Sequence, residues 1–279
     1  MGLQMPELPE VETMLRGIQS ACAGRQLQEL QFVPCTRQPS PVRPDRPSFQ
    51  KVVGSRLTDL ERLGKRILMH FDCGLCIVVE PRMTGLMLVT DPPTVEHLRV
   101  RWQFSGRGVN TVLFWDRRGL GTISLLTPPE LDALRRRLGP DALRISADEF
   151  QRRLKATRRA IKPALLDQQL VAGIGNLYAS EILHLCGISP RRRAHRLLRR
   201  EVVSITEATH EILQQAVRYE GSTLNDGTYR NALNQDGGYQ NHHRVYDRAG
   251  DLCPTCSEGT IRRIVQTQRS TFYCPRCQH

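Results

Sequence analysis

The stretch from Met5 to Thr13 reads Met-Pro-Glu-Leu-Pro-Glu-Val-Glu-Thr, which places three carboxylates and two prolines close together. Proline suits the first position of a helix, so we expect a helix to begin at Pro9. Glu10 and Glu12 then lie in its first turn, where negative charge favours the positive end of the helix dipole. The residues ahead of Pro9 form a short rigid arm, and the rest of the chain is organised around it.

The arm carries a nucleophile if Pro6 is the first residue of the mature chain. A start at Met5, followed by removal of that methionine, would leave Pro6 as a secondary amine beside Glu7. Such an amine can form a charged iminium with a sugar carbon, and the neighbouring carboxylate can move protons. As written, Met1–Gln4 precede Met5, so the Pro6 nitrogen is an amide and is not nucleophilic. Chemistry at Pro6 therefore requires a start at Met5 or loss of the extension; otherwise the stretch is an ordinary helix entry.

The bulk composition indicates a basic protein with one large core or two ordinary ones. The 279 residues carry a formal net charge of +12 and a pI of about 9.7, with far more arginine than lysine. The planar guanidinium suits phosphate, so we expect a polyanionic partner, with a merely basic surface as the alternative. No apolar run approaches the ~18 residues of a membrane span, and no secretory signal is recognisable. We therefore expect a cytoplasmic protein with no membrane partner.

Two Cys-x-x-Cys pairs near the C-terminus predict one zinc ion. Seventeen residues separate the pairs, and their four cysteines are Cys253, Cys256, Cys274 and Cys277. In a reducing compartment such spacing favours metal binding over disulfides. Four thiolates complete a closed tetrahedral Zn²⁺ site without an open position, so the zinc is structural. The zinc would position an intervening hairpin of 261–267 and 270–273, with Arg269 at its tip.

The remaining cysteines are not expected to bind metal. Cys73 and Cys76 form a lone Cys-x-x-Cys between two strand-like runs, which indicates a hairpin turn. Cys22, Cys35 and Cys186 are interpreted as buried small hydrophobes.

The hydrophobic pattern predicts an α+β protein of several domains. Many short strands between Leu27 and Leu126 argue for a β-sandwich or barrel. Strands are expected at 67–71, 76–80, 98–104, 112–115 and 122–126, and helices after Thr127 and at 147–155, 163–168, 177–185 and 201–219. We place an N-terminal sandwich domain at 1–138, a helical domain at 139–240 and a zinc finger at 241–279. The glycine- and asparagine-rich segment 221–238 is expected to be a mobile loop.

A glycine turn joins two of the expected helices. From Val171 to Glu181 the chain reads Val-Ala-Gly-Ile-Gly-Asn-Leu-Tyr-Ala-Ser-Glu. Gly173 and Gly175 allow the backbone to come close to a ligand, and the helix that follows offers its first amides to an anion. Taken alone, the pattern also fits a simple tight turn between helices.

These stretches together resemble the bacterial formamidopyrimidine-DNA glycosylases, which cut oxidised purines out of DNA. The resemblance is carried by Pro6–Thr13, Ala160–Gln168, Val171–Glu181 and Gln268–Cys274, and it covers nearly the whole chain. It implies an N-terminal β-sandwich with a leading helix, a helix–two-turn–helix DNA-binding domain and a zinc-finger hairpin. It also implies a monomer that binds double-stranded DNA containing an oxidised base or an abasic site, in the bacterial cytoplasm and at the nucleoid.

The resemblance assigns the chemistry to the arm. Pro6 attacks the sugar carbon of a nucleotide flipped out of the stack, and Glu7 shuttles protons. Glu10 orients the arm or helps the base to leave. The iminium then allows elimination of the 3′ and the 5′ phosphate. Lys65 and Arg269 complete this catalytic set, Lys65 as a DNA contact and Arg269 as a grip on the phosphates beside the lesion.

Other positions match the DNA contacts of the family. Asn176 and nearby amides hold a phosphate, and Lys162 and Tyr178 are grouped with them. The side chains that fill the hole left by the everted base are Met83, Arg118 and Leu120, with Arg118 facing the orphan base.

Two departures from the family lie in the plug loop. Leu120 stands where the family usually has phenylalanine, and Gly119 where it usually has a basic residue. Leucine stacks less well, which affects lesion search or opposite-base preference more than activity. Segment 221–239 resembles the part of the family that closes over the lesion, and His242 and His243 are interpreted as surface residues or phosphate contacts.

Two other functions are compatible with parts of the sequence. The extension at Met1–Gln4 and the altered plug loop favour a lesion- or abasic-DNA-binding protein of the same fold that is catalytically silent. A generic zinc-ribbon module explains the tail and the charge, but neither the arm nor the glycine turn.

Overall fold

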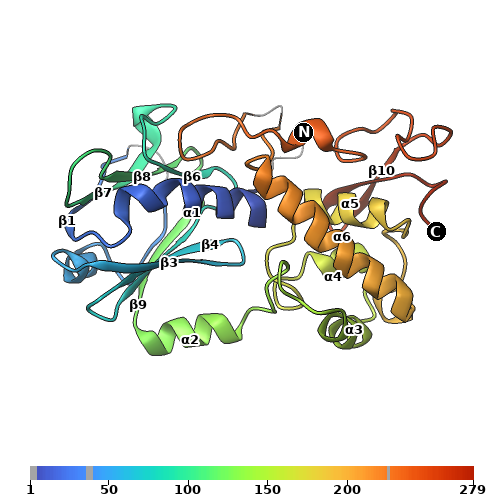
Figure 1. Cartoon of the computed structure of the whole chain (residues 1–279), viewed down its shortest axis with the longest axis horizontal. Coiled ribbons are helices and arrows are strands. Elements are labelled where there is room, and N and C mark those ends of the chain that lie inside the picture. Colours follow the sequence, from blue (N-terminus) through green and yellow to red (C-terminus); the bar gives the residue numbers. More distant parts are fainter. Residues whose placement is uncertain (1–4, 36–39, 225–226) are drawn as a thin grey trace. The chain divides into compact units, whose positions relative to one another are not determined.

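The computed structural model describes residues 5–35, 40–224 and 227–279, so the extension at Met1–Gln4 lies outside the described residues. The chain forms two compact units (Figure 1). Of the described residues, the N-terminal unit comprises those from Met5 to Arg137 together with Tyr219–Gly238, and the C-terminal unit comprises Leu138–Arg218 together with Tyr239–His279. Segment 219–238 therefore packs with the N-terminal unit, although it follows helices of the C-terminal unit in the chain. In the described ranges no helix is long and apolar enough to cross a membrane.

The N-terminal unit is a β-sandwich, which confirms the predicted fold class. One sheet has the strand order β1-β7-β8-β6 and the other the order β2-β9-β5-β4-β3. The first contains β1 (Leu27–Phe32), β6 (Gly85–Leu88), β7 (Leu98–Phe104) and β8 (Thr111–Asp116). The second contains β2 (Val42–Arg43), β3 (Leu57–Leu63), β4 (Arg66–Phe71), β5 (Cys76–Glu80) and β9 (Thr122–Leu126). Neighbouring strands are antiparallel except β2 and β9, which are parallel.

Helix α1 (Leu8–Cys22) begins one residue before the predicted start and packs against both sheets (Figure 1). Val11, Met14 and Ile18 recur at helical spacing and are fully buried in the sandwich core. Burial of this apolar face holds the helix in place, because a helix of this length is marginal in water without tertiary packing. The end of the helix that carries the arm is therefore fixed relative to the sheets.

The C-terminal unit consists of helices followed by a two-stranded hairpin. Its helices are α3 (Ala147–Lys155), α4 (Ile161–Leu165), α5 (Asn176–Leu185) and α6 (Arg199–Arg218), and its hairpin is β10 (Arg262–Gln266) with β11 (Arg269–Tyr273). Helix α2 (Pro128–Arg136) precedes it and begins with the predicted N-cap, since Thr127 and Glu130 form a capping box. Short 3₁₀ helices lie at Pro47–Val52, Val95–His97, Ala194–Arg196 and Tyr239–His242.

Much of segment 219–238 is packed, and the described residues of the predicted loop at 221–238 contain no helix or strand. Tyr229 is 1% exposed and donates from its hydroxyl to the carbonyl of Glu220 at 2.9 Å. The Thr223 hydroxyl donates to the Tyr229 carbonyl at 2.8 Å, and Val89 donates its N–H to Ala232 at 2.9 Å. Glycine and asparagine here supply tight turns within a folded segment. Residues 225 and 226 lie outside the described ranges.

The structure corrects one prediction about cysteines and one about a histidine. Cys22 is buried, and its burial raises the thiol pKa to about 12, but Cys35 and Cys186 are only partly buried. His243, interpreted as a surface residue or phosphate contact, is 7% exposed and packs edge-on against Tyr246. Burial lowers the pKa of His243 to about 4, so it is neutral at physiological pH.

Candidate functional site

Two buried glutamates fix the N-terminal arm. Glu7 is the N-cap of α1, and its side chain accepts the backbone N–H of Glu10. The Glu10 carboxylate accepts the N–H of Glu7 at 2.8 Å and the N–H of Ser222 at 2.9 Å, which joins the arm to segment 219–238. Pro6 is also buried. These hydrogen bonds favour the orienting role among the two roles considered for Glu10.

The turn that carries Lys65 is tied to the same helix. Lys65 lies between β3 and β4 and is 7% exposed. Arg62, near the end of β3, donates from Nε to Glu12 in α1 at 2.8 Å and from Nη1 to the Gly64 carbonyl at 3.2 Å. A hydrogen-bonded pair of opposite charges restrains this turn against the first part of α1. Lys65 and the arm therefore belong to elements in direct contact.

The three predicted plug residues lie on two neighbouring loops of the N-terminal unit. Met83 precedes β6, and Arg118 and Leu120 follow β8. The Arg118 guanidinium donates to the Met83 sulfur at 3.4 Å, so the loops touch through these side chains. Gly119 has φ +66°, a conformation that residues with a side chain rarely adopt. Glycine therefore fits the backbone of this chain at position 119.

The glycine turn of the C-terminal unit is held by Gln168, whose role the sequence did not indicate. Its side chain accepts the N–H of Gly173 at 2.9 Å and donates to the carbonyl of Ile174 at 2.9 Å. Gly173 has φ +112°, which requires glycine. Asn176 is the first residue of α5, and its buried Oδ1 has no hydrogen-bond partner in the described chain. The N-terminus of α5 suits an anion, whereas the Asn176 oxygen can only accept a hydrogen bond and does not itself favour a phosphate.

Lys162 and Tyr178, both predicted as DNA contacts, are buried in the C-terminal unit. Lys162 is completely buried, and its ammonium donates to the carbonyl of Ser270 at 3.0 Å and to the hydroxyl of Thr271 at 2.9 Å. Tyr178 is also completely buried and packs against Tyr239 with ring centroids 5.7 Å apart. Both side chains make contacts inside the C-terminal unit, and these contacts stabilise it.

Four cysteines converge at the base of the β10–β11 hairpin. Their sulfur atoms all lie within 4.8 Å of one another, with Cys253 and Cys277 at 3.6 Å and Cys256 and Cys274 at 3.8 Å. A tetrahedral site with metal–sulfur bonds of about 2.3 Å requires sulfur–sulfur distances of about 3.8 Å. A Cβ on Gly259 would lie 2.6 Å from the Cys274 sulfur, so only glycine allows this closure. The cluster can therefore hold one metal ion.

Arg269 is exposed and opens β11, where it pairs with Gln266. The turn itself consists of Thr267 and Gln268, both with positive φ. Arg269 thus lies beside the tip rather than at it. Two restraints fix its strand: the cysteine cluster at one end and the buried Lys162 ammonium beneath Ser270 and Thr271.

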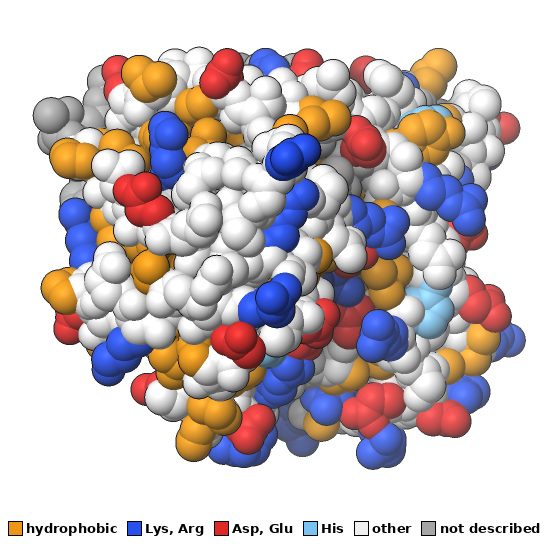
Figure 2. Space-filling view, turned by 60° about the vertical axis from the view of Figure 1, so that its left-hand side comes forward, with side chains coloured by type: hydrophobic (Ala, Val, Ile, Leu, Met, Phe, Trp, Pro, Cys, Tyr) orange, Lys and Arg blue, Asp and Glu red, His pale blue; other side chains and the backbone are white. Residues whose placement is uncertain are grey.

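Figure 2 shows one face of the protein, on which lysine and arginine side chains are spread out with acidic side chains between them. On this face the basic side chains do not form a single patch.

Comparison with known proteins identifies the family. The profile of the formamidopyrimidine-DNA glycosylase N-terminal domain matches residues 5–123, and that of the formamidopyrimidine-DNA glycosylase H2TH domain matches residues 138–228. The formamidopyrimidine-DNA glycosylase of Chloroflexus aurantiacus is 36% identical over 277 residues, which cover 98% of both chains. This chain belongs to the formamidopyrimidine-DNA glycosylase family. The resemblance drawn from the arm, the glycine turn and the zinc finger is confirmed.

Other relatives and solved structures of the glycosylase family agree. The Streptococcus pneumoniae enzyme is 35% identical, covering 98% of this chain and 99% of its own. The MutM (Fpg) protein of Thermus thermophilus is 35% identical with a TM-score of 0.85, covering 98% of each chain. The Lactococcus lactis Fpg, solved with DNA that contains an abasic site, is 27% identical with a TM-score of 0.84 and covers 98% of this chain and 99% of its own.

A further residue of this glycosylase that the sequence did not single out is Glu181 on α5. Its carboxylate accepts three consecutive backbone N–H groups, from Arg244 at 2.8 Å, Val245 at 3.0 Å and Tyr246 at 2.8 Å. Burial raises the pKa of Glu181, while the three N–H donors act to lower it. Glu181 fixes the segment that leads into the zinc finger. Glu181 is the one acidic residue of α5, and this was the available signal.

Proposed function

We propose that this chain excises oxidised purines, such as 8-oxoguanine and formamidopyrimidines, from double-stranded DNA and then cleaves the strand as a lyase. Membership of the formamidopyrimidine-DNA glycosylase family over 98% of the chain carries this proposal. Glycosylase activity in base excision repair follows from the family, and strand cleavage is typical of it. A solved relative in complex with 8-oxoguanine-containing DNA, 28% identical with a TM-score of 0.85, supports the lesion class.

The proposed reaction uses Pro6 as nucleophile. With residues 1–5 absent, the Pro6 nitrogen carries a lone pair and attacks C1′ of the everted nucleotide. The N-glycosidic bond breaks and its electron pair leaves with the base, which is protonated. The Pro6 nitrogen gives up its proton, and its lone pair then opens the sugar ring by breaking the C1′–O4′ bond. O4′ takes up a proton and remains on C4′ as a hydroxyl, which leaves an iminium between Pro6 and C1′. Removal of a C2′ proton then expels the 3′ phosphate, and a second elimination expels the 5′ phosphate, with Glu7 as the proton carrier.

The active chain is proposed to begin at Pro6. The family profile matches from residue 5 onward, which agrees with a start at Met5. Methionine is usually removed before a small residue, and this step would convert the Pro6 amide into the amine that the reaction needs. The capping box of Glu7 and Glu10 would then hold that amine in one orientation.

DNA contacts are proposed for residues of both units. Asn176 at the start of α5 binds a phosphate, Arg269 on the hairpin grips phosphates beside the lesion, and Lys65 contacts the backbone near the arm. Met83, Arg118 and Leu120 fill the space that the everted base leaves. One zinc ion held by the four cysteines would fix the hairpin that carries Arg269, because structural zinc supplies folding free energy.

Borohydride trapping tests the reaction, since it reduces an iminium to a stable bond. A chain that starts at Met5 and the chain as written are each incubated with a duplex containing one 8-oxoguanine. Trapping by the Met5 chain alone, with the DNA found on Pro6 by peptide mass spectrometry, is the expected result. Equal trapping by both would mean that the extension is removed or that another amine reacts. Absence of trapping in both would refute the lyase.

A catalytically silent lesion-binding protein is the second candidate. Burial of Pro6 in the chain as written favours it. Such a protein would bind abasic DNA tightly and never become trapped, so the same experiment separates the two functions.

A further inference from the structure

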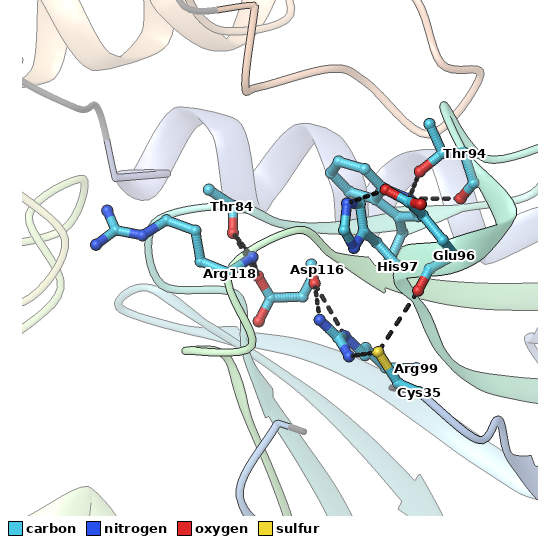
Figure 3. Close-up of polar contacts among 9 residues, drawn as sticks. Cys35, Thr84, Thr94, Glu96, His97, Arg99, Asp116 and Arg118 are labelled. Atoms are coloured by element: carbon cyan, nitrogen blue, oxygen red, sulfur yellow. Dashed lines mark hydrogen bonds and ion pairs between the residues drawn. The ribbon is translucent and has the colours of Figure 1, made fainter. Parts of the chain in front are cut away.

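Asp116, the last residue of β8, has a completely buried carboxylate that the proposed reaction does not use. One of its oxygens accepts the hydroxyl of Thr84 in a short hydrogen bond and the N–H of Arg118 at 3.2 Å (Figure 3). The other accepts the N–H of Gly121 at 2.7 Å and the hydroxyl of Ser40 at 3.3 Å. Four donors from three separate segments therefore meet on one side chain.

The backbone of Asp116 is fixed as firmly as its side chain. Arg99 on β7 is 4% exposed and donates from Nε at 2.9 Å and from Nη2 at 2.7 Å to the Asp116 carbonyl (Figure 3). This guanidinium also contacts the Cys35 sulfur. A forked donor on one carbonyl leaves the peptide little freedom to rotate. Asp116 is thus an immobile point at the end of the sheet.

The partners of Asp116 flank the plug residues. Thr84 follows Met83 directly, and its Oγ1 also accepts the N–H of Arg118 at 3.0 Å. Arg118 and Gly121 enclose Leu120. The first carboxylate oxygen therefore joins the Met83 loop to the Arg118 end of the other loop, and the second oxygen holds the far end of that loop.

Glycine at position 121 makes this arrangement possible. A Cβ there would lie 2.6 Å from the Phe114 ring and 3.1 Å from the second carboxylate oxygen of Asp116. Gly85 is equally constrained, since its Cβ would lie 2.4 Å from the Pro81 carbonyl oxygen. Gly121 therefore allows its loop to approach the carboxylate closely, and Gly85 allows the close packing of the Met83 loop at the start of β6.

We propose that Asp116 is a positioning residue that couples the two plug loops, so that Met83 and Leu120 enter the DNA as one rigid wedge. This inference rests on the proposed function of these two side chains. Extruding a base costs the stacking and pairing of that base, and the wedge must compensate for it. A preorganised wedge loses little conformational freedom on insertion. Rigidity matters more here because leucine stacks less well than the phenylalanine usual at position 120.

Asp116→Asn tests the coupling, because the amide nitrogen cannot accept a hydrogen bond and one set of donors loses its partner. The assay is single-turnover excision of 8-oxoguanine by the Met5 chain, on a fully paired duplex and on a duplex with the lesion inside a run of mismatches. In the second substrate the mismatches already disrupt stacking and pairing around the lesion, so less free energy is needed to extrude it. We expect a loss of about tenfold to a hundredfold on the paired duplex, as for one or two unsatisfied buried donors, and at most about threefold on the mismatched one.

A second variant covers the case in which Asp116→Asn does not fold. Thr84→Val keeps the shape of the side chain and removes only the hydroxyl through which Thr84 bonds both Asp116 and Arg118. It should show the same selective loss, and 2-aminopurine beside the lesion should report slower unstacking in stopped flow. Equal losses on both substrates, or an unchanged fluorescence rise, would overturn the proposal and leave Asp116 a mere structural acceptor.

Failure of the proposed function can be distinguished from failure of the proposed coupling. If the unsubstituted Met5 chain forms no borohydride-trapped adduct, the reaction itself is wrong. If that chain is trapped normally and Met83→Ala and Leu120→Ala are additive in it, the coupling alone is wrong. The expected result is a double variant less impaired than the sum, with additivity restored in an Asp116→Asn background.

Discussion

Replacement of Lys162 by methionine separates a supporting lysine from a DNA-binding one. Methionine has a similar length but no charge and no donor. In the C-terminal unit the ammonium bonds the Ser270 carbonyl and the Thr271 hydroxyl, and both Lys162 and Thr271 are completely buried. Both acceptors belong to β11, the strand that begins with Arg269. The substitution should therefore loosen that strand from beneath, even in the absence of DNA.

The magnitude follows from the contacts that are lost. Each hydrogen bond to a charged group contributes about 1.5–3 kcal/mol, so the two bonds together account for about 3–6 kcal/mol. Methionine avoids the cost of burying an ammonium, which offsets part of that loss. We expect a net decrease of about 2–4 kcal/mol in the free energy of unfolding of the C-terminal unit. A double-mutant cycle with Thr271→Val should give a coupling of about 1–2 kcal/mol.

Urea unfolding of the zinc-loaded protein without DNA, with hydrogen exchange at the β11 amides, measures this decrease. Lys155→Met is the matched control, because Lys155 is exposed and bonds only a surface carbonyl, that of His195 at 3.0 Å. The control should change the unfolding free energy by less than about 0.5 kcal/mol. The reasoning is refuted if Lys162→Met leaves stability unchanged and lowers the salt slope of DNA binding by about 0.9, the value for one phosphate contact.

Four other perturbations have definite expected outcomes. Cys274→Ser should lose metal and DNA affinity together, as measured by a zinc-release assay and fluorescence anisotropy; undiminished DNA affinity would contradict the metal-dependent hairpin. Glu181→Gln leaves the Arg244 N–H without an acceptor and should cost about 1–3 kcal/mol in urea unfolding, with an unchanged midpoint arguing against the anchor. Burial opposes ionisation of Glu61, but hydrogen bonding and charge from Arg135 outweigh it and lower its pKa below 4.5. The stability difference between the wild type and Glu61→Gln should therefore be constant near neutral pH and shrink as pH falls below about 4.5, when followed by thermal unfolding; a difference that grows in acid would reverse the assigned sign. Lesion-DNA affinity should fall steeply with salt in anisotropy titrations, and a flat profile would exclude a phosphate clamp.

Local signals in the sequence were sufficient for most elements. Strands β5, β7 and β9 and helix α3 have the predicted bounds, because short apolar runs between glycine, proline and aspartate leave few alternatives. The four zinc-spaced cysteines converge for a similar reason: each pair needs only a tight turn to bring its sulfur atoms together. Spacing within a few residues was enough to predict both features.

The burial of polar side chains could not be predicted from such short spacings in the sequence. Lys162 lies in a stretch that resembles the family, and nothing nearby in sequence shows that its partners are Ser270 and Thr271, more than a hundred positions away. Tyr178 follows the glycine turn as a DNA contact would, but its ring faces Tyr239. Whether such a side chain is buried depends on which distant segment packs over its helix. A single sequence does not show which segments pack together.

The same limit explains why the hydrogen-bond partners of three acidic residues are visible only in the structure. Glu10, Asp116 and Glu181 are each at most 1% exposed, and each accepts at least two backbone N–H groups from segments without regular secondary structure. Strands and helices satisfy their own amides, whereas irregular loops need an outside acceptor when they are buried. A carboxylate has two oxygens and can hold several donors at once. Three irregular segments lack the backbone hydrogen bonds of a helix or strand: the arm, the plug loops and the entry to the zinc finger. In each of them one buried carboxylate accepts the backbone N–H groups and so fixes the shape of the segment.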